Sequence, residues 1–144
     1  MAPGARHPPD LRHLDRTAAP PARAPRSTES RREATRFGRF GEIVAARWYR
    51  RAGYRVLASN WRCREGELDL VVARAGEVAF VEVKARGSDR FGRGLDAVDH
   101  RKQRRLRAAA LRWLDESGAG FVEIRFDVVE VDRRGRPLVH EACF

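Results

Sequence analysis

Two short and almost entirely apolar runs limit what this chain can fold into. They are LDLVVA at residues 68–73 and VAFVEV at residues 78–83, separated by the four residues RAGE. A run that is apolar at nearly every position is typical of a strand covered on both faces, and a short connection containing glycine favours a hairpin. The sequence therefore predicts a hairpin inside a sheet that other elements cover on both sides.

The flanking segments predict the elements that cover this hairpin. Large apolar residues recur every three or four positions from Phe37 to Trp48, which predicts a helix over about 33–52. A second helix is predicted over 98–116, with Gly118 just beyond its end. Strand patterns at residues 54–60, 121–131 and near 138–141 complete an α/β fold with the order α-β-β-β-α-β-β.

The first 32 residues differ in composition from the rest of the chain. They hold six of the seven prolines and many alanines, without a hydrophobic period. Such a segment cannot bury enough apolar surface to become ordered, so 1–32 is predicted to be a disordered basic tail. The remaining 112 or so residues, 33–144, suffice for a single domain and are too few for two.

The charge balance indicates a polyanionic partner. The chain has 30 lysines and arginines against 20 aspartates and glutamates, a formal charge of +10. We therefore expect nucleic acid as the partner, with DNA as the first candidate, although each arginine alone could equally be a solvated surface cation.

No apolar run approaches the ~20 residues of a membrane span, and Cys63 and Cys143 lack metal-site or disulfide spacing, so we expect a cytoplasmic protein without a membrane partner.

The few charges inside the hairpin are the candidate site. A turn centred between Ala75 and Gly76 would place Asp69 opposite Glu82, on one face of the sheet. Directly opposed Cβ atoms lie about 4.5–5.5 Å apart, so two carboxylates there repel unless a cation neutralises them. Mg²⁺ or Mn²⁺ would do so, and Lys84 on the same face could orient an attacking water. The alternative is a salt-bridged strand edge, and a bulge at the turn would move Asp69 to the other face.

Several ordered blocks also resemble a known family. From residue 37 to about 131, the blocks FGRFGEIVAARWYRRAGYRVLASNWR, GELDLVV, VAFVEVKAR and AVDHRKQRRL resemble the YraN family of small bacterial proteins. That family is similar to the restriction-endonuclease-like superfamily, and to archaeal Holliday-junction resolvases in particular. Their motif, an Asp followed by Glu-x-Lys on the next strand, is matched here by Asp69, Glu82 and Lys84. The resemblance implies a mixed central sheet flanked by helices, a metal bound by Asp69 and Glu82, and Glu42 on the first helix as an auxiliary catalytic carboxylate; Ala85 departs from a frequent small hydroxyl residue.

Other polar residues are candidates for supporting roles. Glu67 is predicted opposite Lys84 and would hold that amine in place. Because related nucleases often send a polar residue from the second helix toward the site, Lys102 and Gln103 are candidates there. Phosphate contacts are expected from arginines of that helix and of the loop after the Glu-x-Lys strand, although a solvated helix face is equally consistent with the pattern; these are Arg101, Arg104 and Arg105 on the helix, and Arg86, Arg90 and Arg93 in the loop.

Two functions of different kinds remain open at this point. The first is a Mg²⁺- or Mn²⁺-dependent endonuclease that hydrolyses phosphodiester bonds in structured or branched DNA, with a homodimer as an open possibility. The second is a non-catalytic module of the same fold that binds nucleic acid for a partner. The intact set of Asp69, Glu82 and Lys84 favours the first, because a binding module gains nothing from paired carboxylates beside phosphates.

Overall fold

The computed structural model describes residues 28–87, 98–120 and 123–144, and the expected phosphate contacts Arg90 and Arg93 lie outside these ranges. The order of elements is α-β-β-β-α-β-β, which confirms the predicted fold class. The elements are α1 (Thr28–Arg51), β1 (Arg55–Arg62), β2 (Glu67–Arg74), β3 (Glu77–Ala85), α2 (His100–Ser117), β4 (Glu123–Val131) and β5 (Pro137–His140).

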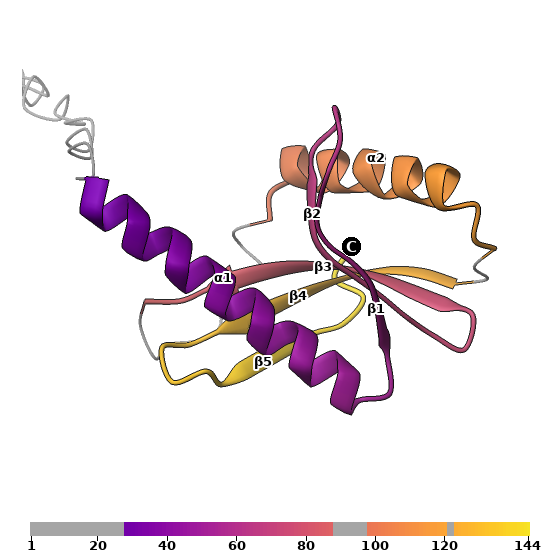
Figure 1. The fold of residues 1–144 in the computed structure, drawn as a ribbon. Coiled ribbons are helices and arrows are strands. Elements are labelled where there is room, and N and C mark those ends of the chain that lie inside the picture. Colours follow the sequence, from indigo (N-terminus) through magenta and orange to yellow (C-terminus); the bar gives the residue numbers. More distant parts are fainter. Residues whose placement is uncertain (1–27, 88–97, 121–122) are drawn as a thin grey trace, which may run out of the picture.

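The five strands form one mixed sheet in the order β1-β2-β3-β4-β5. Strands β1, β2 and β3 are antiparallel neighbours, β3 and β4 are parallel, and β5 returns antiparallel to β4. The parallel pair needs a crossover connection, and α2 supplies it. In Figure 1 the two helices lie on opposite sides of the sheet, and the loop end of the β1–β2 hairpin rises beside α2. Both faces of the central strands are therefore covered, as the apolar runs predict.

The β2–β3 hairpin has the predicted register. Its paired residues run from Arg74 opposite Glu77 to Leu70 opposite Val81. The two turn residues both have positive φ, 48° at Ala75 and 83° at Gly76, as a two-residue turn matched to the twist of the strands requires. Because no extra residue is inserted at the turn, side chains in β2 and β3 alternate in phase along the hairpin.

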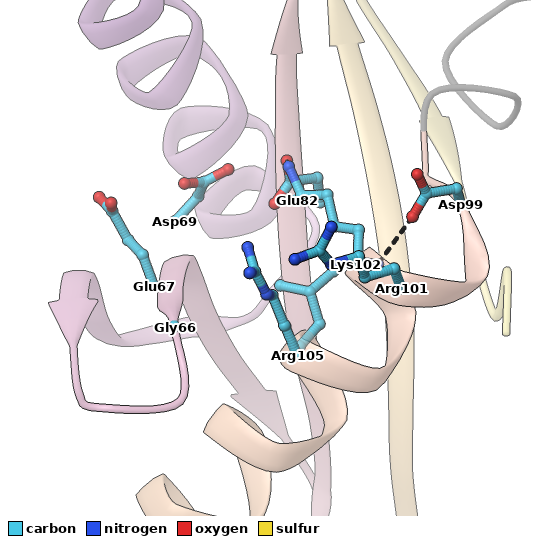
Figure 2. Close-up of a pocket in the computed structure, with 9 residues that line it drawn as sticks. Gly66, Glu67, Asp69, Glu82, Asp99, Arg101, Lys102 and Arg105 are labelled. Atoms are coloured by element: carbon cyan, nitrogen blue, oxygen red, sulfur yellow. Dashed lines mark hydrogen bonds and ion pairs between the residues drawn. The ribbon is translucent and has the colours of Figure 1, made fainter.

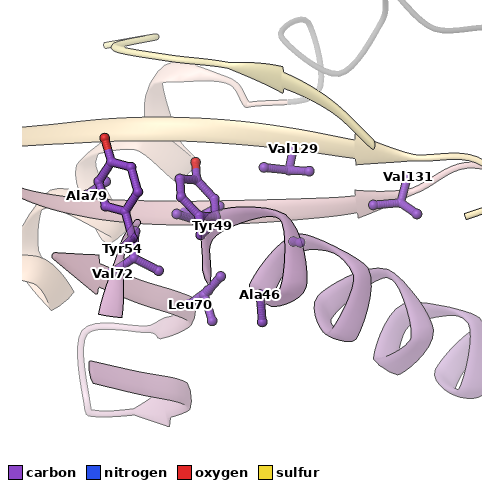
Figure 3. Packing of buried hydrophobic residues seen from close by; sticks show 10 residues of the cluster. Ala46, Tyr49, Tyr54, Leu70, Val72, Ala79, Val129 and Val131 are labelled. Atoms are coloured by element: carbon purple, nitrogen blue, oxygen red, sulfur yellow. The ribbon is translucent and has the colours of Figure 1, made fainter. Parts of the chain in front are cut away.

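This alternation divides the core into two clusters. On one face Leu70 and Val72 pack with residues of α1, and on the other Val71 and Phe80 pack with residues of α2. Figure 3 shows the α1 side, where the rings of Tyr49 and Tyr54 lie over the strands. The cluster on the α1 side comprises Ala45, Ala46, Tyr49, Tyr54, Leu70, Val72, Ala79, Val81, Val129 and Val131.

The first helix is longer than predicted. It begins at Thr28 rather than at about residue 33, so the last five residues of the predicted tail are helical. The helix residues that follow the last proline of the tail include several Arg and Glu, which favour helix, and Glu29 in the first turn interacts favourably with the helix dipole. Within the described ranges, neither helix is long and apolar enough to cross a membrane.

Candidate functional site

The candidate site lies where β2 and β3 run beyond their paired region, at the end away from the turn. Beyond the Leu70–Val81 pair, the Asp69 side chain takes part in holding the two strands together, because its Oδ2 accepts a hydrogen bond from the main-chain nitrogen of Val83, 2.9 Å away. The predicted juxtaposition of β2 and β3 carboxylates therefore rests on the hairpin register and on this contact.

Glu82 is the most enclosed group of the site, with only 6% of its side chain exposed. Its Oε1 forms an ion pair with the ammonium of Lys84, 3.0 Å away on the same strand. The same oxygen accepts a hydrogen bond from the ammonium of Lys102 on α2. A buried carboxylate is tolerated when it is paired and hydrogen-bonded. Glu82 meets that condition with two lysines on one oxygen atom.

Asp69 behaves differently from Glu82 because its neighbours are mostly unfavourable for a negative charge. Burial, followed by the charge of Glu82, raises the pKa of Asp69 to about 7. The hydrogen bond from Val83 opposes this rise, and the charge of Glu42 adds to it. In the metal-free domain the Asp69 carboxyl therefore keeps its proton to a much higher pH than an ordinary aspartate does.

The two lysines also differ in their electrostatics. Burial lowers the pKa of Lys84, and the attraction of Glu82 offsets this only in part because Lys102 is a second cation nearby. Burial also acts to lower the pKa of Lys102, but its hydrogen bond and charge interaction with Glu82 outweigh burial, so the net change is upward. Lys102 thus remains a cation, while Lys84 gives up its proton more readily than an ordinary lysine.

Asp69, Glu82 and Lys102 line a hollow of about 460 Å³ between the strands and the N-terminal end of α2. We call it the central hollow. In Figure 2 Glu67 and Asp69 lie on the left, Glu82 lies in the middle, and Arg101, Lys102 and Arg105 reach toward these carboxylates from α2 below them. Its polar wall residues are Glu67, Asp69, Glu82, Asp99, Arg101, Lys102 and Arg105. Facing walls of opposite charge suit a ligand that carries both a cation and an anion.

The start of α2 holds its cationic wall in place. Asp99 precedes the helix, and its Oδ1 accepts the main-chain N–H of Lys102 at 2.8 Å, an N-cap contact that fixes where the helix begins. Gln103 does not reach the site as expected. Its Nε2 donates instead to the carbonyl oxygen of Val98, 3.1 Å away, so it braces the entrance of the helix.

Two further expectations need correction. Glu67 does not pair with Lys84; it lies opposite Arg62 of β1 and forms an exposed ion pair with it, Nε to Oε2 3.4 Å. Lys84 is not available to Glu67 because its ammonium forms an ion pair with Glu82. Arg104 lies on α2 as expected but does not line the central hollow, whereas Arg101 and Arg105 do.

Glu42 lies near the site but in a neighbouring hollow. Its Oε2 accepts a hydrogen bond from Asn60 of β1, 2.8 Å from the Asn60 Nδ2. The neighbouring hollow, about 700 Å³ between α1 and β1, shares Glu67 with the central hollow. From there the charge of Glu42 contributes to the raised pKa of Asp69.

Sequence reasoning missed a second polar group beside Lys84. Glu130, which is fully buried, lies opposite Lys84 on the parallel strand β4. It accepts hydrogen bonds from the Nε of Arg86 at 3.1 Å and pairs with His140 Nε2 at 3.0 Å. The Nη2 of Arg86 is buried without a hydrogen-bond partner. The signal available in the sequence was the lone glutamate in the apolar run FDVVEV.

The donor set at Asp69 and Glu82 fits a hard divalent cation. Among the described residues, no group of three or more His, Cys, Asp or Glu side chains is arranged to hold a metal. Magnesium commonly takes only one or two carboxylates and completes its shell with water and substrate phosphate, so two are sufficient. A structural zinc site, which needs four sulfur or nitrogen ligands, has no counterpart there.

The fold and the site define a class: a small α/β domain with a covered mixed sheet and a cluster of two acids and two lysines. The chain belongs to the uncharacterised protein family UPF0102, whose model matches residues 41–131, and this confirms the family expected from the sequence. It is 50% identical over 96 residues to a UPF0102 protein of Frankia alni, covering 67% of this chain and 80% of the relative. It is 47% identical over 114 residues to one of Mycolicibacterium vanbaalenii, covering 79% and 91%.

Proposed function

We propose that this domain is a divalent-metal-dependent endonuclease that hydrolyses phosphodiester bonds in structured or branched DNA. The observation that carries the proposal is the central hollow, where Asp69 and Glu82 face the cations of α2, together with the ion pair between Glu82 and Lys84. A buried acid with a raised pKa in a hollow, as Asp69 is, is a feature of functional sites. The resemblance of the Asp and Glu-x-Lys motif to junction resolvases supports the choice of branched DNA.

The chemistry follows from the positions of the side chains. When bound, Mg²⁺ or Mn²⁺ would supply a water molecule of lowered pKa and a positive charge for the leaving oxygen. Asp69 and Glu82 would hold the ion through their carboxylate oxygens. Lys84, whose own pKa is lowered by burial, would orient the attacking water and offset charge on the phosphorus centre.

Arginines of the α2 wall would position the substrate. Arg101 and Arg105 both line the central hollow and lie one helical turn apart, so they project from the same face of α2. Guanidinium groups bind phosphate oxygens through two parallel hydrogen bonds, which fixes the backbone without reading the bases. We therefore expect binding that depends strongly on salt and weakly on sequence.

The test is a cleavage assay on labelled junction, flap, duplex and single-stranded DNA with Mg²⁺ or Mn²⁺. The wild type is compared with Asp69→Asn and Lys84→Ala, and Asp115→Asn, an exposed carboxylate of α2 away from the hollow, is the matched control. Both site variants are expected to lose at least about 100-fold in rate, in line with the loss of one stabilising group, and the control to lose nothing. Cleavage that survives either site change would contradict the proposed site.

A second function is favoured by one specific observation. Glu82 is already neutralised by Lys84 and Lys102, so the cluster is electrostatically balanced without an ion. A module that binds nucleic acid for a partner and has no catalytic role could keep such a cluster for stability. DNA binding by the wild type without cleavage, in the presence of either ion, would select this alternative.

A further inference from the structure

We propose that Lys102 is a resident counter-ion of the site, which holds Glu82 in the metal-free domain and must leave it before a divalent cation can bind. The inference rests on the proposed function, because it concerns the same carboxylates. It assigns to Lys102 a role in controlling occupancy of the site, which differs from orienting a neighbouring group.

The geometry shows competition for one atom. The ammonium of Lys102 contacts Oε1 of Glu82, and Lys84 contacts the same oxygen at 3.0 Å. With Glu82 only 6% exposed, little of this carboxylate remains accessible to a further cation. An ion that takes this oxygen as a ligand therefore has to displace one of the two ammonium groups.

Lys102 is the one that can leave. Lys84 comes from the same strand as Glu82, two residues further on, and its side chain is 22% exposed. Lys102 reaches across from the first turn of α2, and its side chain is 38% exposed. The main-chain nitrogen of Lys102 is fixed by Asp99, so the side chain can swing on its flexible stem while the helix stays in place.

Charge balance supports the same conclusion. With Asp69 ionised, Asp69, Glu82, Lys84 and Lys102 sum to zero, and a divalent ion added to this set leaves two positive charges close together. If Lys102 moves away from Glu82, it lowers this local excess and remains beside Arg101 and Arg105 on the cationic wall of the central hollow. There a backbone phosphate would meet three cations. Occupation of the metal site and binding of phosphate are thus coupled through one side chain, and such a coupling acts in both directions.

The test measures binding of Mn²⁺ alone to the full chain by calorimetry, with no DNA and no activity readout. Lys102→Met is expected to bind Mn²⁺ about 10-fold or more tightly than the wild type, which corresponds to the loss of one charged hydrogen bond that competes for Glu82. Arg101→Met is the matched control, since it removes one positive charge from the same hollow without touching Glu82. We expect it to change the affinity no more than about 3-fold, as a partly exposed charge would.

Two further variants separate the possible failures. Lys102→Gln, which keeps a polar side chain, must behave like Lys102→Met, and circular dichroism checks that both are folded. Mn²⁺ binding by the wild type that Asp69→Asn abolishes, with equal affinities in Lys102→Met and Arg101→Met, would overturn the role of Lys102 and leave the metal site standing. Absence of Mn²⁺ binding in the wild type and in Lys102→Met would overturn both.

Discussion

Replacing Asp69 by asparagine should stabilise the metal-free domain at alkaline pH. The pKa of Asp69 rises from an ordinary 3.8 to about 7, because of burial and the charge of Glu82. A group whose pKa is higher in the folded state than in the unfolded state costs stability as it ionises, so stability falls as the pH rises from about 4 to about 7. At 1.36 kcal/mol per pH unit, the full cost above pH 8 is about 4 kcal/mol. Asparagine resembles the protonated acid and avoids this cost.

The assay is urea unfolding in EDTA at pH 4.5, 6 and 8, followed by tryptophan fluorescence. Asp69→Asn is expected to exceed the wild type by only about 1 kcal/mol at pH 4.5 and by about 4 kcal/mol at pH 8. The exposed variant Asp115→Asn controls for the general effect of removing a negative charge. Parallel pH profiles for wild type and Asp69→Asn would refute the reasoning, because the burial and repulsion at Asp69 would then not act on folding.

Two other predictions follow from contacts that line or adjoin the site. Arg105→Ala should weaken binding of duplex DNA and reduce the salt slope of log K by about 1 in fluorescence anisotropy, whereas Arg104→Ala, outside the hollow, should do so less. Equal losses of DNA affinity in Arg105→Ala and Arg104→Ala would contradict the assignment of phosphate binding to the α2 face that lines the central hollow. Glu130→Ala should destabilise the domain by about 3 kcal/mol in urea unfolding, since the partly buried charge of Arg86 then lacks its carboxylate partner. His140→Ala should lower the free energy of unfolding clearly less. An equal loss would contradict the view that Glu130 is the group that holds Arg86 and His140 together.

The central hairpin could be predicted from the sequence because the interactions that determine its register lie between residues close together in the chain. An apolar run on each side of a two-residue turn leaves one register that keeps both faces covered, and this register brings Asp69 and Glu82 to the same end. The pairing of Glu67 could not be predicted in the same way. A bulge between Val56 and Ala58 shifts the register of β1, and this places Arg62 opposite Glu67.

The contacts between distant segments were beyond sequence reasoning. Lys84 and Glu130 are 46 residues apart and meet only because α2 returns the chain to pair β4 parallel to β3. The rotation of α2 about its axis, which sends Lys102 to the site and Gln103 to the carbonyl of Val98, depends on the packing of the whole helix. Periodicity gives the buried face of a helix, but it does not say which polar residue at its border points toward a neighbouring strand.

The hydrogen bond from the Val83 main chain gives the Asp69 carboxylate a structural role in addition to its proposed role as a metal ligand. A substitution that removes its oxygen would leave a strand amide without an acceptor, and under the proposed function it would also remove a metal ligand. A descendant that abandoned catalysis would still be under pressure to keep an acceptor there. Aspartate and asparagine both meet that demand and alanine does not, so a retained acceptor at this position is by itself a poor guide to whether a relative is active.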